Sequence, residues 1–263
     1  MSDIILTRGR PSPRQRRAMV LAMTRNRLAY EKWLSRRIVE LDRKLKRELL
    51  EDPSESNRFR LKAQYRESLL DVFVRLYYNV GNRMADMLSD DEKSVPGMET
   101  KKKKTEKEKM DERTRLFIEE QVGYRITRIC DSTFAKVQSW YYQAEGDVGK
   151  FETLLQSHFS EARSRRIAVT ETTMAMNRSL NDTAKELSFG RPMEKEWMSS
   201  HMSNMRKGHE EADGQTVDMD EPFLVESPRG QIEKLMFPTD SSLGATACNC
   251  VNCRCVSIPR YKS

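Results

Sequence analysis

Four cysteines within eight positions are the residues of this sequence best suited to chemistry: Cys248, Cys250, Cys253 and Cys255. A fifth, Cys130, stands alone in a helical pattern that favours a small buried side chain. In a reducing compartment such crowding favours a metal site over disulfides. Thiolates bind zinc strongly, and zinc prefers four nitrogen or sulfur ligands in a tetrahedron. The cluster therefore predicts a structural zinc site.

A zinc site in this chain needs a ligand from a second segment, because four cysteines so close together cannot all reach one metal easily. His209 is the best candidate for that ligand, and Asp213 or His201 are weaker ones. The alternative is a set of reduced, metal-free cysteines, some of them buried as small apolar side chains. The ligand set that we expect is His209, Cys253, Cys255 and either Cys248 or Cys250.

Catalysis by one of these cysteines is a further interpretation. It requires a base such as His209 to activate the thiolate and a third group to orient that base. With three histidines in the chain and four clustered cysteines, a structural role is favoured over a reactive one. No Gly-rich phosphate-binding loop is present, and close acids such as Asp218 and Asp220 have no spacing that would hold them around a reacting bond. The sequence therefore predicts no active site.

Residues 190–263 must position the cluster, and their pattern predicts a compact α+β module. Short apolar runs alternate there with Gly, Pro, Asn and Asp, as expected for short strands and turns around one helix near residues 202–212. The expected strands contain Glu196-Trp197-Met198, Gln215-Thr216-Val217, Phe223-Leu224-Val225, Leu235-Met236-Phe237 and Cys255-Val256-Ser257-Ile258.

Most of the preceding chain is predicted to be helical. In residues 14–88 apolar side chains recur mostly three or four positions apart, which is the period of amphipathic helices, and Asp52-Pro53 interrupts the pattern. This predicts a long antiparallel helical hairpin whose second helix is capped by Ser54 or Ser56. The same period returns over residues 111–189, which we expect to form a helical body.

Two segments are predicted to lack regular structure. Residues 1–13 form a basic arm with Gly and Pro, and residues 89–110 form a charged linker. The linker has almost no apolar side chains, so burial cannot offset the entropy lost on ordering it. The expected fold class is therefore mainly α with a small α+β C-terminal domain: a long helical hairpin and a helical body, followed by a compact cysteine-containing module.

Composition and charge indicate an extended helical protein with a basic N-terminal part. Of the 263 residues, 37% are apolar and 33% are charged, which indicates extended helical packing with wide solvated faces. Residues 1–60 hold 16 Lys and Arg against 8 Asp and Glu, and the net charge of the chain is +7. The basic excess of residues 1–60 could attract phosphate backbones or an acidic protein surface. A solvated helix face with no binding partner explains the same excess equally well. The candidate contact residues are Arg14, Arg16, Arg17, Arg25 and Arg27.

Neither a membrane span nor a secretory signal is expected. No stretch approaches the roughly 18 uninterrupted apolar residues that a spanning helix needs. No apolar region of useful length follows the opening residues 1–6 either. We therefore expect the protein to stay in a cytosol or in a particle assembled there.

A series of motifs from about residue 115 to 255 resembles the Mu F-like head morphogenesis proteins, or minor head proteins, of tailed phages. The helical part carries Ile167-Ala168-Val169-Thr170-Glu171 and then Asn177, where the family has an Ile-Ala-Arg-Thr-Glu-like run followed by an Asn. Val169 replaces the usual Arg, which puts in doubt any ion pair assigned to that position. The C-terminal part matches best, at Lys195, Trp197, Arg206, His209, Asp213-Gly214, Phe223, Pro238, Asp240 and Asn252-Cys253-Arg254-Cys255.

The resemblance implies a minor head protein of a tailed bacteriophage that is not an enzyme and acts in procapsid assembly near the portal. The implied partners are the portal, major capsid or scaffolding protein, with double-stranded DNA as a further candidate for the basic end. The implied location is the virion, in the head interior or near the portal, after assembly in the host cytoplasm. Two rival classes are a zinc-stabilised nucleic-acid-binding module, which would need base contacts, and a hydrolase or toxin-like enzyme that depends on His209 or Cys253.

Overall fold

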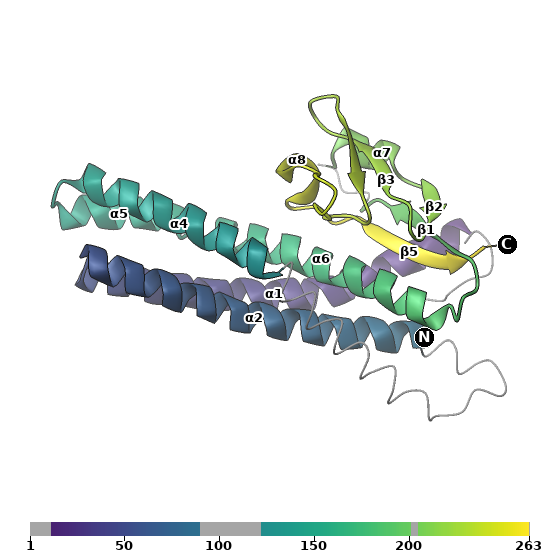
Figure 1. Ribbon diagram of the computed structural model, residues 1–263, viewed down its shortest axis with the longest axis horizontal. Helices are drawn as coiled ribbons and strands as arrows, with labels where there is room; N and C mark the ends of the chain where they lie inside the picture. Colours follow the sequence, from purple (N-terminus) through teal and green to yellow (C-terminus); the bar gives the residue numbers. More distant parts are fainter. Residues whose placement is uncertain (1–11, 90–121, 201–204, 263) are drawn as a thin grey trace.

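The structure, a computed structural model, describes residues 12–89, 122–200 and 205–262. Within these ranges long helices run side by side along the molecule, and a small α+β module lies against one flank of them (Figure 1). Among the described residues, no helix combines the length and the apolar character of a membrane span. The expected fold class, mainly α with a small α+β C-terminal domain, is confirmed. The long helices are α1 Pro13–Glu51, α2 Glu55–Ser89, α4 Gly123–Ala144, α5 Val148–His158 and α6 Glu161–Leu187.

Local signals set both ends of α1 and the start of α2. The hydroxyl of Ser12 accepts a hydrogen bond from the amide of Gln15 (3.3 Å), whose side chain accepts one from the Ser12 amide (2.8 Å). Pro53 ends the helix, because proline lacks the donor that a further turn needs. Ser54 then accepts a hydrogen bond from the amide of Asn57 (3.4 Å) and caps α2.

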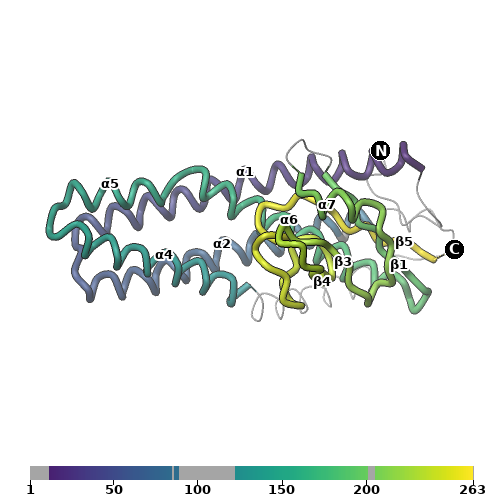
Figure 2. The backbone as a smooth tube through the Cα atoms, turned by 90° about the horizontal axis from the view of Figure 1, so that it is seen from above, coloured from purple at the N-terminus to yellow at the C-terminus, as the bar shows by residue number. Residues whose placement is uncertain are grey.

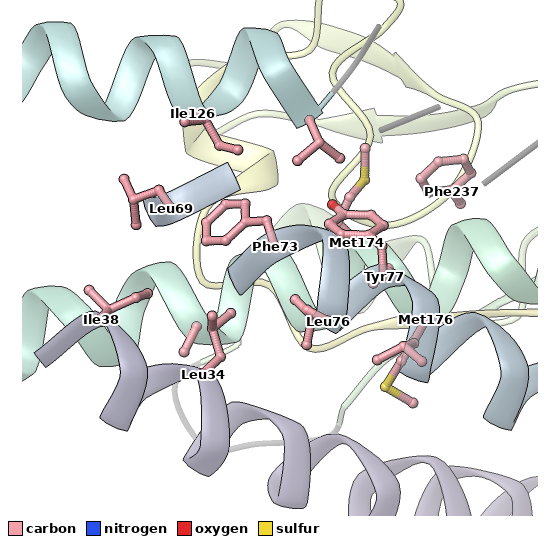
Figure 3. Packing of buried hydrophobic residues seen from close by; sticks show 14 of the residues in the cluster. Leu34, Ile38, Leu69, Phe73, Leu76, Tyr77, Ile126, Met174, Met176 and Phe237 are labelled. Carbon is pink, nitrogen blue, oxygen red and sulfur yellow. The ribbon is translucent and has the colours of Figure 1, made fainter. Parts of the chain in front are cut away.

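Helix α6 is the centre of the helical part, because it packs against both α1 and α2. Figure 2 shows α5 beside α1 and α4 beside α2. Burial of each large apolar side chain in this core contributes about 1.5–3 kcal/mol. Side chains from four helices meet there, among them Leu34, Ile38, Leu69, Phe73, Leu76, Tyr77, Ile126, Met174 and Met176 (Figure 3).

The middle of α6 is buried on all sides, since the C-terminal strand β5 (Val256–Tyr261) covers the face that α1 and α2 leave open. Every residue from Ala168 to Asn177 is buried. Ala and Thr make up much of this stretch, and their small side chains allow neighbours to approach closely. The main core is continuous from the helices into the module, because it includes Phe237, Val256 and Ile258.

A buried polar cluster fixes how α1, α2 and α6 align. The carboxylate of Asp42 accepts hydrogen bonds from Tyr65 (2.6 Å) and Ser164 (3.3 Å), and it pairs with Arg163 (3.2 Å). Burial raises the pKa of Asp42 above its ordinary value, although Arg163 opposes the shift. Because buried polar groups lose stability without partners, these three helices are held in one register.

The C-terminal module, as far as it is described, contains two small sheets and two short helices. One antiparallel sheet has the strand order β2-β1-β5, and the other is the antiparallel hairpin β3-β4. A second, smaller core inside the module includes Trp197, Phe223 and the side chains of three cysteines. The elements are β1 Met193–Met198, α7 Lys207–Glu211, β2 Thr216–Asp218, β3 Phe223–Glu226, β4 Ile232–Leu235, α8 Ala247–Cys250 and β5.

Two details of the module differ from the sequence-based prediction. The strand expected at residues 235–237 lies earlier, at Ile232–Leu235, because the amide of Met236 turns to the carboxylate of Asp240 (3.0 Å). Residues 247–250 form the short helix α8, which the pattern did not predict. The basic arm and the charged linker fall almost wholly outside the described residues.

Candidate metal centre

A turn after α7 places His209 against strand β1. At Asp213-Gly214 the chain folds back, and the amide of Gly214 donates a hydrogen bond to the carbonyl of Trp197 (2.8 Å). Gly214 has a φ of 81°, which glycine adopts without strain. The carboxylate of Asp213 accepts a hydrogen bond from the amide of Ser199 (2.7 Å). These contacts hold α7, and with it His209, in a fixed place beside β1.

Aromatic rings and a close backbone contact fix the imidazole of His209. The ring packs edge-on against Trp197 with centroids 5.4 Å apart, and Trp197 packs against Phe223 at 5.3 Å. The preceding residue, Gly208, lies so near β3 that a side-chain carbon there would stand 1.9 Å from the carbonyl oxygen of Glu226. Because only glycine fits at this contact, the distance between α7 and β3 is set by the backbone.

Helix α6 holds the loop that carries Cys253 and Cys255. The hydroxyl of Thr170 accepts a hydrogen bond from the amide of Asn252 (2.9 Å), and the side chain of Asn177 donates one to the carbonyl of Cys255 (3.1 Å). Asn252 has a φ of 57°, in the left-handed region that Asn tolerates better than most residues. The loop is therefore bent at a defined point on α6.

Two arginines, one at the start of α7 and one in α1, hold the loop that carries Cys253 and Cys255. Arg206, at the start of α7, donates a hydrogen bond to the carbonyl of Val251 (2.6 Å). Arg27 of α1 donates one to the carbonyl of Arg254, between the two cysteines (3.0 Å), and pairs with Glu31 (2.9 Å). Arg27 and Glu31 are both buried. The N-terminal helix thus takes part in holding the cysteine loop.

The side chains of His209, Cys253 and Cys255 converge on one point. The Nδ1 atom of His209 lies 3.5 Å from the Sγ atom of each cysteine, and the three ligand atoms lie within 4.8 Å of one another. In a tetrahedral zinc site the bond lengths, about 2.3 Å to sulfur and about 2.0 Å to nitrogen, place these ligands about 3.5 Å apart. All three residues are at most 2% exposed. This group could hold a metal ion.

The hydrogen bonds of His209 leave its Nδ1 lone pair available to a ligand. Asn249 donates from its Nδ2 to the carboxylate of Glu233 (2.9 Å), so its Oδ1 is the atom that faces Nε2 of His209 (3.3 Å). An amide oxygen can only accept, so Nε2 donates, and in the neutral imidazole Nδ1 is then the unprotonated nitrogen. Metal-binding histidines commonly donate their other N–H to a fixed acceptor of this kind. When the ring is neutral, the arrangement therefore presents an unprotonated nitrogen to the two sulfurs, as a metal ligand requires.

The two sulfurs differ in their tendency to ionise. Burial opposes charge on Cys253, but hydrogen bonds with Cys255 and His209 outweigh it and lower the pKa of Cys253 well below its ordinary value. The hydrogen bond with Cys253, together with burial, raises the pKa of Cys255. The indole N–H of Trp197 favours the charged form of Cys255, and it has no oxygen or nitrogen acceptor among the described residues. A cation at this point would stabilise the second thiolate as well.

The other expected ligands lie outside this group. Cys250 donates its thiol to the carbonyl of Asp240 (3.2 Å), and burial raises the pKa of Cys250 to about 12. Cys248 is half-buried on α8. Asp213 is engaged in the turn after α7, and His201 lies outside the described residues. Of the candidates, the structure brings together His209, Cys253 and Cys255.

A small pocket of about 120 Å³ opens beside the three ligand side chains. Arg206 and Arg254 are part of its lining, so the pocket favours negatively charged groups. Zinc prefers four ligands, and the described residues supply three. A fourth ligand would therefore reach the metal from this pocket.

Comparison with known families settles which family the chain belongs to. Residues 97–258, a range that runs through α4, α5 and α6 into β5, match the family described as Phage Mu protein F like protein. The chain belongs to this family. No curated protein and no solved structure matches it. The family is the one implied by the motif series, and that expectation is confirmed.

The motif residues of this Mu F-like protein mostly hold the fold together. Glu171, two residues after Val169, pairs with Arg125 of α4 (2.8 Å). Lys195 is buried, and its ammonium group donates hydrogen bonds to two loop carbonyls (3.0 and 2.8 Å). Burial lowers the pKa of Lys195 to about 8. These residues support the His209, Cys253 and Cys255 group indirectly, by fixing α6 and β1.

The five arginines expected to contact phosphate divide into two groups. Arg27 is 5% exposed and bonded to Glu31 and to the cysteine loop, while Arg16 pairs with Glu196 (3.1 Å) and Asp213 (3.2 Å). These two arginines are thus committed to contacts within the fold. The exposed members of the set are Arg14, Arg17 and Arg25.

Reasoning from the sequence missed Asn249, Glu233 and the structural role of Arg27. Glu233 contacts Asn249 from a strand 16 residues earlier, and Arg27 contacts Arg254 across 227 residues. No local spacing indicates contacts over such separations. Asn249 could have been found, because an amide side chain between two cysteines is a polar residue in a segment otherwise suited to burial.

Proposed function

We propose that this Mu F-like protein is a structural minor head protein of a tailed phage that acts in procapsid assembly near the portal. The observation that carries the proposal is the family match over residues 97–258. Its partners are then the portal, major capsid or scaffolding protein, and its location is the virion. Mass spectrometry of purified procapsids and virions, with pull-downs on portal protein, tests this. Absence of the chain from both particles and from the pull-down would overturn it.

In this proposal zinc stabilises the C-terminal module as a rigid docking surface. His209, Cys253 and Cys255 hold the ion, and the Asn249–Glu233 pair orients the imidazole. Bound zinc supplies a cross-link between α7 and the cysteine loop, which are distant in sequence. Because the binding free energy of a structural metal adds to the free energy of folding, the module should lose stability without it.

Zinc quantification on the purified full-length chain tests this assignment. We expect about one zinc per chain in the wild type, and loss of most of it in Cys253→Ser, Cys255→Ser and His209→Ala. Cys250→Ser is the matched control, because that thiol is bonded to a backbone carbonyl and should not affect the metal content. Equal and negligible zinc in the wild type and in Cys253→Ser would refute the assignment.

The rival interpretation, a cysteine hydrolase, has three observations in its favour. Cys253 has a lowered pKa, His209 lies 3.5 Å away, and Asn249 orients the imidazole. Against it, Nδ1 of His209 is shared between two sulfurs, and both Cys253 and His209 are 2% exposed. That enclosure suits a metal ligand better than a nucleophile. A hydrolytic turnover that disappears in Cys253→Ser would support the rival.

We also propose that the exposed arginines of α1, Arg14, Arg17 and Arg25, contact the phosphates of packaged DNA. Such binding should weaken steeply as salt rises, because each neutralised phosphate releases counterions. Fluorescence anisotropy with duplex DNA at several salt concentrations measures this. A flat salt response would leave protein docking as the role of this end. A clear sequence preference would favour the other rival, a zinc-stabilised regulator with base contacts.

A further inference from the structure

A groove of about 510 Å³ lies between α4, α6 and the segment around α8. Glu171 is the one acid in its described lining, and the groove shares no lining residue with the pocket at the metal centre. The groove is therefore a separate and strongly basic site. Its basic lining residues are Arg125, Arg128 and Lys136 from α4, and Arg163 and Arg166 from α6.

Only part of this positive charge is neutralised within the protein. At the inner side of the groove, Arg125 pairs with buried Glu171 (2.8 Å) and Arg163 pairs with buried Asp42 (3.2 Å). Unpaired like charges along one groove repel one another unless an anion is bound. The exposed cations that contact no carboxylate in the described part of the chain are Arg128, Lys136 and Arg166.

The acidic side chain in the middle of α4 does not compensate these cations. Asp131 pairs with Lys62 of α2 (2.7 Å), on another side of the helix. The groove-facing positions of α4 include Arg128, Ser132 and Lys136, spaced by four residues as expected for one helix face. Arg128 and Lys136 therefore lie on one face of α4, with the hydroxyl of Ser132 between them.

Arg128 and Lys136 are far enough apart to contact different phosphates of one nucleic-acid strand. Arg128 and Lys136 are eight residues apart, which corresponds to about 12 Å along the helix axis. One strand of duplex DNA rises about 3.4 Å per nucleotide, so this distance covers three to four phosphates. Arg166 adds a third cation from the opposite wall, on α6.

We propose that this groove binds the phosphate backbone of duplex DNA. Arginine, lysine and hydroxyl groups are the usual partners of phosphate oxygens, and Ser160 and Ser241 add hydroxyls to the lining. The exposed lining side chains are Arg, Lys, Ser and Tyr with a single Ala. An acidic protein segment would also need apolar anchors for its affinity, and this rim offers few.

The groove extends the proposed DNA contact to a second surface. The proposal for the groove does not depend on whether the arginines of α1 bind DNA. Fluorescence anisotropy of the full-length protein with a labelled duplex of random sequence, between about 50 and 200 mM salt, tests it. Three variants each remove three exposed positive charges: Arg128→Ala/Lys136→Ala/Arg166→Ala in the groove, Arg14→Ala/Arg17→Ala/Arg25→Ala on α1, and Lys207→Ala/Arg229→Ala/Lys234→Ala on the module as the matched control.

The groove variant should lower the slope of log affinity against log salt by between about 2 and 3, and weaken binding at low salt at least about tenfold. The module variant, with the same loss of charge, should change the affinity by less than about twofold. Equal weakening in these two variants would overturn the site, because it would show a general effect of net charge. All three variants should keep the thermal unfolding midpoint of the wild type, since the substituted side chains are exposed.

The variant on α1 separates the failure of this inference from the failure of the proposed function. Weakening in the α1 variant alone would overturn the groove and leave the proposed role of α1 standing, whereas weakening in the groove variant alone would do the reverse. A labelled poly-glutamate peptide provides the last comparison. If the groove variant loses that peptide but binds DNA as the wild type does, the groove is a docking site for an acidic protein and the DNA assignment fails.

Discussion

Replacing Gly208 with alanine tests how the backbone sets the position of His209. Gly208 lies in α7, and its φ is outside the left-handed region, so alanine can adopt its conformation. In an exposed helix, alanine is more favourable than glycine by about 1 kcal/mol. Helix propensity alone therefore predicts that the substitution stabilises the protein.

The contact with β3 predicts the opposite sign. The added Cβ would stand 1.9 Å from the carbonyl oxygen and 2.9 Å from the carbonyl carbon of Glu226, whereas non-bonded atoms pack best about 3.5–4.0 Å apart. The backbone of α7 or β3 must therefore move by about 1 Å or more. Overpacking of this kind costs about 1–3 kcal/mol. The same shift would carry Nδ1 of His209 away from the sulfurs that it faces at 3.5 Å.

Urea unfolding followed by circular dichroism measures the change in unfolding free energy, and zinc retained after dialysis against a chelator measures the effect on the site. Gly149→Ala in α5 is the matched control, because a Cβ there meets only the side-chain oxygen of Asp147 at 3.4 Å. That variant should be as stable as the wild type or more stable by up to about 1 kcal/mol. A Gly208→Ala protein with wild-type stability and wild-type zinc would refute the reasoning.

Two further predictions concern other parts of the molecule. Burial lowers the pKa of His158 from 6.5 to about 4, so its contribution to stability is complete above pH 6.5 and is lost as the pH falls toward 4. Allowing for partial exposure, this amounts to roughly 1–2 kcal/mol, and His158→Gln should flatten that part of the stability curve measured by urea unfolding at a series of pH values. Arg27→Ala should cost about 3–5 kcal/mol in the same assay, because it leaves Glu31 buried without its partner and the Arg254 carbonyl without its donor. Arg37→Ala removes one member of an exposed ion pair and should cost less than about 1 kcal/mol. Equal costs for the two variants would contradict the role of Arg27 in stabilising the cysteine loop.

The helices could be predicted from the sequence because their signals are local. Leu34, Ile38, Leu45 and Leu49 recur at helical spacing and are all buried, and Pro53 ends α1. The buried face of the same helix also contains Asp42, which apolar spacing does not explain. Its partners come from α2 and α6, and such contacts leave no trace in the sequence around Asp42.

The candidate metal centre could be predicted only in outline. Clustered thiols and a single suitable histidine indicate a metal site near Cys253, because few other chemistries need that combination. Which cysteines meet His209 depends on the path of the chain through α8. This short helix directs Cys250 to the carbonyl of Asp240, away from His209, and nothing in the spacing of the cysteines reveals that direction.

The burial of α6 on every side has a mechanical consequence. In the described part of the chain, the helices and the C-terminal module share one core, so they cannot swing apart without exposing Phe237, Val256 and Ile258 to water. Exposing each of these side chains costs about 1.5–3 kcal/mol. The molecule should therefore respond to force as a rigid arm. A partner that displaces the module would also displace the far tips of the helices, and a small rotation at one end would become a large movement at the other.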